Sequence, residues 1–150
     1  MDSPEWSVER FVGAGRVRFG DERASCRRLL GEPSAVFAKG AGVRKDADAF
    51  DAIGAHLVFD ERERLELVEL FFPALVVVDG TPIRPGVDSL VDVVSRLERR
   101  GHRVEPADAG ANSPTAGVAL YAEAGRVEAV SAYRRGYYDR SPISKVDDGT

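Results

Sequence analysis

The chain has few of the residues that build covalent or metal-based sites. Its 150 residues include one cysteine and two histidines, so neither an internal disulfide nor a cluster of cysteine thiolates around a metal can form. His56 lies in a predicted strand and His102 follows a predicted helix, and no spacing suggests that the two share a site. Cys26 falls on an apolar helix stripe, where a small buried side chain is expected. We therefore predict neither a metal nor a cofactor.

Long apolar runs are also missing. The longest nearly apolar stretch, residues 70–78, is interrupted by Pro73, whereas a helix needs about 20 apolar residues to cross a bilayer. Residues 1–9 carry three carboxylates and lack the basic-then-apolar order of a signal peptide. We expect a cytoplasmic protein that does not associate with membranes.

Basic residues are not in excess, and familiar catalytic motifs are absent. The 21 basic residues are outnumbered by 25 acidic ones, and the net charge of −4 argues against a nucleic-acid-binding surface, which is usually basic. Only three of the basic residues are lysine, a bias typical of GC-rich bacterial genomes.

The Gly-Ala-Gly triplets at residues 13–15 and 40–42 lack the spacing of a phosphate-binding loop. No residue is predicted to be catalytic.

What is present is the composition of one globular domain. Hydrophobic residues make up 43% and charged residues 31% of the chain. A short amphipathic helix is predicted over residues 21–30, because Gly31 and Pro33 end an apolar stripe. A stronger helix is predicted between Gly86 and Gly101, where apolar residues recur at i, i+3, i+4 and i+7 from residue 90.

Two segments of the chain, residues 55–72 and 117–134, can be aligned without a gap. Four positions are identical, Phe59 aligns with Tyr121, and Phe71 aligns with Tyr133. Each segment has the pattern of two strands around a polar turn, and each follows one of the predicted helices. This similarity predicts an internal duplication.

The duplication predicts an α+β single domain. Two β-α-β-β-like repeats, at about residues 15–72 and 74–135, would form one mostly antiparallel sheet that two helices cover. Residues 38–52 are predicted to be a long loop, and the polar residues 141–150 a flexible tail.

The first repeat carries a pattern that resembles a known family. A glycine at residue 20, a short helix, the run Leu29-Leu30-Gly31-Glu32-Pro33 and a hairpin containing Leu57-Val58-Phe59-Asp60 resemble the repeat unit of the SmpA-type outer-membrane assembly lipoproteins. The tandem β-lactamase inhibitor proteins are built from two related units. The resemblance covers the first repeat well and the second only in its hairpin, and the chain lacks a lipid-attachment cysteine near its start. It implies a protein-binding module rather than an enzyme.

Tyrosine and arginine concentrate after the last predicted strand. These residue types dominate binding hot spots, because each combines a large contact area with a directional polar group. The alternative is that this segment folds back on the sheet, with its tyrosines half-buried and its arginines pointing outward. The predicted partner-binding residues are Tyr133, Arg134, Arg135, Tyr137, Tyr138 and Arg140.

These observations predict a non-enzymatic domain that binds another protein. In its sharper form the prediction is an intracellular inhibitor or immunity protein that covers a toxin or an enzyme. A small acidic domain suits this role, because charge complementarity speeds the capture of a basic partner. The alternative is a small-ligand-binding protein that uses the sheet face and the 38–52 loop, and an enzyme is the third possibility.

Overall fold

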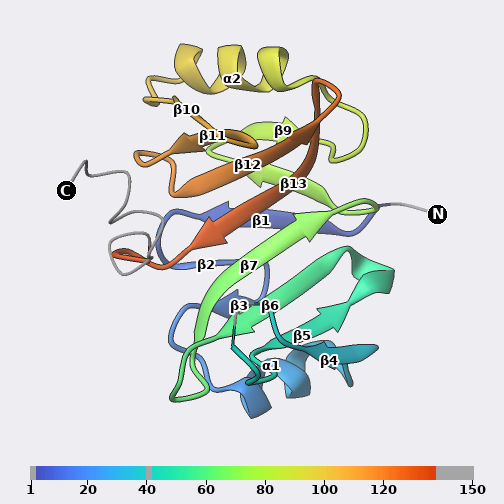
Figure 1. The fold of residues 1–150 in the computed structure, drawn as a ribbon. Coiled ribbons are helices and arrows are strands. Elements are labelled where there is room, and N and C mark those ends of the chain that lie inside the picture. The colour runs from blue at the N-terminus through green and yellow to red at the C-terminus, as the bar shows by residue number, and fades with distance from the viewer. Residues whose placement is uncertain (1–2, 40–41, 138–150) are drawn as a thin grey trace.

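The computed structural model describes residues 3–39 and 42–137, which Figure 1 draws as a coloured ribbon. Within these residues the chain forms two α-helices, a short 3-10 helix and two β-sheets, of five and eight strands. The predicted α+β class and the mostly antiparallel pairing are confirmed, but the prediction of a single sheet is wrong. The second sheet was missed because several of its strands are only two or three residues long.

The smaller sheet contains the N-terminal strand and two hairpins. Its strands are β1 (Glu5–Glu9), β2 (Gly13–Ala14), β3 (Val17–Arg18), β8 (Leu75–Val78) and β9 (Thr81–Ile83). They lie in the order β3-β2-β1-β8-β9, with β1 antiparallel to β2 and parallel to β8. β1 therefore joins a hairpin from each half of the chain.

The larger sheet is antiparallel throughout and contains four strands from each half of the chain. Its strands are β4 (Ala35–Phe37), β5 (Ala47–Phe50), β6 (Ala55–Phe59), β7 (Leu65–Phe71), β10 (Glu105–Ala107), β11 (Gly110–Ser113), β12 (Val118–Glu123) and β13 (Arg126–Tyr133). They lie in the order β10-β11-β12-β13-β7-β6-β5-β4. β13 and β7 run side by side through the middle of the molecule (Figure 1).

The helices α1 (Arg23–Leu30) and α2 (Leu90–Arg99) lie at opposite ends of the molecule (Figure 1). Each helix begins two residues after an aspartate, Asp21 or Asp88, so the residue that follows the aspartate takes the cap position. The residues at the cap positions are Glu22 and Ser89, and the Ser89 hydroxyl accepts a hydrogen bond from the Asp92 amide. Asp21 and Asp88 instead accept hydrogen bonds from backbone amides in the preceding turn, at 2.9 and 2.8 Å.

Alternation along the strands gives the larger sheet two different faces. Its inner face, with Leu57, Val68 and Val130, contributes to one core with side chains from the smaller sheet and both helices, including Cys26 and Leu97. We call the opposite side the outer face. The residues that alternate with the inner ones, such as Leu67 and Tyr133, lie on it and form a smaller apolar cluster.

The segment predicted as a long loop over residues 38–52 is partly a strand. β5 covers four of its residues, all buried, and the 3-10 helix η1 (Asp51–Ile53) follows directly. The strand was missed because Ala-Asp-Ala has low β-propensity. It is held by ladders to β4 and β6 on both sides.

The gapless alignment of the two hairpins is wrong by one residue in their first strands. Ala55 pairs with Leu70, whereas Val118 pairs with Ala132. When β7 is aligned on β13, Ala55 therefore corresponds to Val118. Both ladders also have a register shift four residues along the first strand.

The one-residue offset between the first strands places Phe59 and Tyr121 on opposite faces of the larger sheet. Phe59 is fully buried in the main core, whereas Tyr121 lies on the outer face and is 48% exposed. The turns account for this difference. Five residues, 60–64, lie between the paired residues Phe59 and Leu65 of the first hairpin, whereas four, 123–126, lie between the equivalent pair Ala122 and Val127 of the second. The predicted equivalence of these two aromatic residues is therefore wrong.

Candidate functional site

The outer face of the larger sheet carries a row of polar and small side chains across its middle. Strand register aligns His56 on β6, Glu69 on β7, Ser131 on β13, Ala119 on β12 and Asn112 on β11. All five are partly exposed. The smaller sheet and both helices pack against the inner face, so they leave this row uncovered.

A charged group lies at the β6–β7 end of this row. The Glu69 carboxylate contacts both the Lys39 ammonium group and His56 Nδ1, and His56 Nε2 lies 3.3 Å from Asp51. Burial by itself raises the pKa of Glu69, but the hydrogen bonds from His56 and Lys39 outweigh burial and lower the pKa to about 2. Glu69 is therefore an anion that is already paired. The His56 ring is held edge-on between the rings of Phe37 and Phe71.

The predicted tyrosine and arginine segment borders the outer face. Tyr133 is 5% exposed, and its hydroxyl donates a hydrogen bond to Asn112 at 2.9 Å. Its ring packs against Phe11 and Tyr137, and the Arg135 guanidinium lies 4.3 Å above the Phe11 ring. The structure thus brings these four side chains together as one cluster, which we call the aromatic edge (Phe11, Tyr133, Arg135 and Tyr137).

The other predicted site residues are placed differently. Arg134 forms ion pairs with Asp60 at 3.2 Å and Glu66 at 3.4 Å, so it ties the end of β13 to the first hairpin. Tyr138 and Arg140 lie outside the described residues. Partner binding by the six predicted residues stays a prediction.

His102 has separate partners from those of His56. Its Nε2 atom lies 2.8 Å from Asp79 and its Nδ1 atom 3.1 Å from the Thr115 hydroxyl, beside a cavity of about 380 Å³. An aspartate, a histidine and a hydroxyl are the three types of group that form the catalytic triad of many hydrolases. The Thr115 oxygen, however, accepts a hydrogen bond from the Arg103 amide. The next two amides, at residues 116 and 117, both donate to the Ser113 carbonyl and are not directed at an oxyanion.

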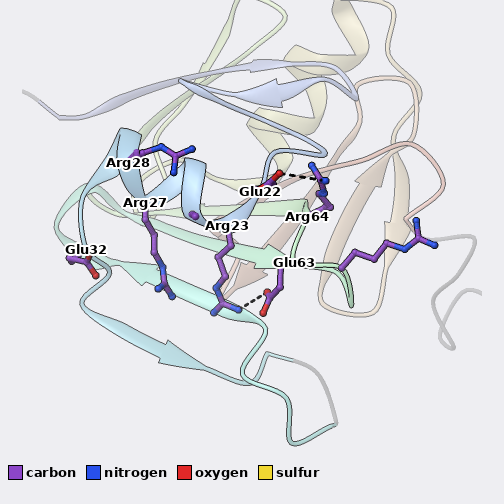
Figure 2. A pocket seen from close by; sticks show the side chains of 9 residues that line it. Glu22, Arg23, Arg27, Arg28, Glu32, Glu63 and Arg64 are labelled. Carbon is purple, nitrogen blue, oxygen red and sulfur yellow. Dashed lines mark hydrogen bonds and ion pairs between the residues drawn. The ribbon is translucent and has the colours of Figure 1, made fainter.

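A cavity of about 850 Å³ lies beside α1 and is lined by five arginines and three glutamates. Figure 2 shows Arg23 and Arg27 extending side by side from α1, with Glu63 reaching Arg23 and Glu22 reaching Arg64. α1 forms one wall, and the turn between β6 and β7 contributes the other. The lining residues are Glu22, Arg23, Ala24, Arg27, Arg28, Glu32, Arg62, Glu63 and Arg64.

Asp48 on β5 holds two of these arginines, Arg23 and Arg27, through hydrogen bonds. Its carboxylate is fully buried and accepts hydrogen bonds from Nε and Nη2 of Arg23, at 3.1 and 2.7 Å, and from the same atoms of Arg27, both at 2.8 Å. Burial by itself raises the pKa of Asp48, but the hydrogen bonds and charges of Arg27 and Arg23 outweigh burial and hold the pKa below its ordinary value. Asp48 is therefore charged at neutral pH and fixes both guanidinium groups.

The sequence carries one signal for this arrangement. Arg23 and Arg27 are four residues apart and share one face of α1. Asp48 is a lone carboxylate between two alanines, in a strand that is buried on both sides. A buried acid of this kind needs a cationic partner.

None of the helices among residues 3–39 and 42–137 is long and apolar enough to cross a membrane. In the same residues, no group of three or more histidine, cysteine, aspartate or glutamate side chains is arranged to hold a metal ion. Comparison of the chain with protein-family models, with curated proteins and with solved structures finds no match.

Proposed function

We propose that the chain is a non-enzymatic domain that binds another protein through the outer face of the larger sheet. The observation that carries this proposal is the row of small and polar side chains across the middle of that face, which the described residues leave partly exposed, with the aromatic edge beside it. Central strands of a sheet provide a rigid platform, so a partner can dock without a large loss of conformational entropy.

The size of the outer face suits a protein better than a small molecule. Eight strands at spacings of about 4.8 Å give a width of about 34 Å. A standard interface buries about 800 Å² on each partner, which corresponds to a patch about 32 Å across. The aromatic edge adds the residue types that contribute most to binding energy.

In its sharper form, the proposal is an inhibitor or immunity protein that covers a toxin or an enzyme in the cytoplasm. The net charge of −4 favours capture of a basic partner, because opposite charges steer the encounter.

We propose also that the two halves of the chain arose as repeats, each with the order β-β-α-β-β-β-β. Matching hydrogen bonds support this, because the Leu65 amide donates to the Asp21 carbonyl before α1 and the Val127 amide donates to the Asp88 carbonyl before α2. The pairing of β7 with β13 is symmetric about Glu69 and Ser131, as a twofold relation between halves requires.

The test is affinity capture with Ser131→Arg, which places a long cation at the centre of the outer face. Ser95→Arg on the exposed surface of α2 is the matched control. Proteins encoded beside the gene are tested first, followed by a cell extract. The proposal expects a protein that the wild type and Ser95→Arg retain and Ser131→Arg loses, with all three thermal midpoints alike.

Equal retention by all three chains would contradict the use of the outer face. A thermal stabilisation of the wild type by a metabolite that Ser131→Arg abolishes, without any captured protein, would favour the small-ligand alternative instead.

A further inference from the structure

We propose that the cavity beside α1 binds a small ligand that carries at least two phosphate or carboxylate groups. This site is separate from the outer face and does not depend on the proposed function. Asp48, which anchors the cavity, pairs in register with the inner-face residue Leu57. The cavity and the outer face therefore lie on opposite sides of the larger sheet.

Three guanidinium groups at the cavity have unused hydrogen-bond donors. Arg27 binds Asp48 through Nε and Nη2, and its Nη1 forms no hydrogen bond with the described residues. Among residues 3–39 and 42–137, the Arg28 guanidinium donates only to the Ser25 hydroxyl. The exposed guanidinium of Arg62 has no hydrogen-bond or ion-pair partner in the described part of the chain. Each can donate two parallel hydrogen bonds to a phosphate or carboxylate group.

The carboxylates of the cavity do not cancel these cations. Glu63 pairs with Arg23 at 2.9 Å, and Glu22 pairs with Arg64 at 3.6 Å. Glu32 is the remaining acid in the lining. Five arginines, three glutamates and Asp48 sum to a net charge of +1 (5 − 3 − 1), in a chain whose net charge is −4.

The cationic groups are partly organised before a ligand arrives. Asp48 fixes the guanidinium of Arg27, so this side chain loses little freedom on binding.

The size of the cavity and the placement of its arginines on two walls fit a small ligand with two anionic groups. Its volume of about 850 Å³ lies in the range of small-molecule sites, about 300–1,000 Å³. Arg27 and Arg28 belong to the α1 wall, whereas Arg62 belongs to the β6–β7 turn. One anionic group can be held by each wall, and a single anion would leave one wall unused.

The test is calorimetric titration of the full chain with inorganic pyrophosphate and, separately, with citrate, at constant ionic strength. We expect saturable binding of one of these probes, with a dissociation constant below about 1 mM. Arg28→Gln and Arg62→Gln should each weaken binding about fivefold or more, because each removes charge-assisted hydrogen bonds. Arg99→Gln on the exposed surface of α2 removes the same charge far from the cavity and should leave binding unchanged.

The two probes distinguish the chemistry of the ligand. Tighter binding of pyrophosphate indicates a phosphate-bearing ligand, and tighter binding of citrate indicates a polycarboxylate. The absence of saturable binding for both probes would overturn the proposal. Equal weakening by all three substitutions would also overturn it, since that result reflects net charge alone. These variants retain Asp48 and its arginines, so their thermal midpoints should match that of the wild type.

Discussion

Replacing Asp48 with asparagine tests whether one buried carboxylate holds α1 on the larger sheet. The substitution keeps the size of the side chain and removes its charge. Two arginine side chains, 12% and 32% exposed, would then face a neutral amide. Breaking a buried ion pair in this way costs about 3–5 kcal/mol. We expect the lower part of this range, because Arg27 can turn toward solvent.

Urea denaturation measures this loss directly. With a slope of about 2 kcal/mol per molar urea, a loss of 3 kcal/mol lowers the unfolding midpoint by about 1.5 M. The corresponding fall in thermal midpoint is about 6–12 °C for a domain of this size. Asp92→Asn is the matched control, because Asp92 forms an exposed ion pair with Arg96 and should contribute less than about 0.5 kcal/mol.

The pH dependence gives a second readout of the same group. The pKa of Asp48 is lower in the folded chain than in the unfolded chain, so its contribution to stability is complete above the unfolded value of about 3.9 and is lost as pH falls through the folded value. Asp48→Asn should remove this part of the acid sensitivity. A loss below about 1 kcal/mol at pH 7 would refute the reasoning, since it would mean that the buried charge contributes no net stability.

Four further predictions concern single residues. Burial raises the pKa of the Cys26 thiol to about 12, so a thiol reagent at pH 8 should label the native chain at least about a thousandfold more slowly than the chain in denaturant. Labelling of the native chain within seconds would instead indicate an accessible, reactive thiol. The lowered pKa of Glu69, about 2, means that the unfolding free energy should fall as pH decreases from about 4.5 toward 2. The unfolding free energy of Glu69→Gln should fall less steeply over this range. Parallel pH curves for the variant and the wild type would contradict the pairing of Glu69. Leu97→Ala should cost about 2–5 kcal/mol in urea unfolding, because Leu97 is fully buried; an unchanged midpoint would show that α2 does not cover a core. Tyr137→Ala should weaken association with a captured partner by more than about 1 kcal/mol while leaving the thermal midpoint nearly unchanged; a large stability loss alone would show that Tyr137 only closes the fold.

Periodic segments were predictable from the sequence. α2 begins and ends close to its apolar stripe, and β6 and β7 lie within the segment 55–72 that was predicted to hold two strands. β5 and β11 were missed because their alanine, glycine and asparagine residues have low β-propensity. Their strand structure comes from neighbours on both sides, which a single sequence does not show.

The candidate sites were less predictable than the elements. Tyrosine and arginine are enriched near residue 133, but Phe11, which completes the aromatic edge, is more than 100 residues away in sequence. The arginine cavity depends on Asp48, whose partners lie on a helix and not on its own strand. Such contacts follow from topology, and the sequence pattern gives no direct sign of topology.

The position of β13 has a consequence for synthesis on the ribosome. β7 is apolar along most of its length and stays an unpaired edge until residues 126–133 have left the exit tunnel. Exposed edges of this kind pair readily with other chains. The middle of the larger sheet is therefore completed only after β13, its last strand in sequence, has been synthesised. A nascent chain that stalls or is truncated before residue 126 would expose the unpaired edge of β7. Such a chain would bind chaperones or aggregate.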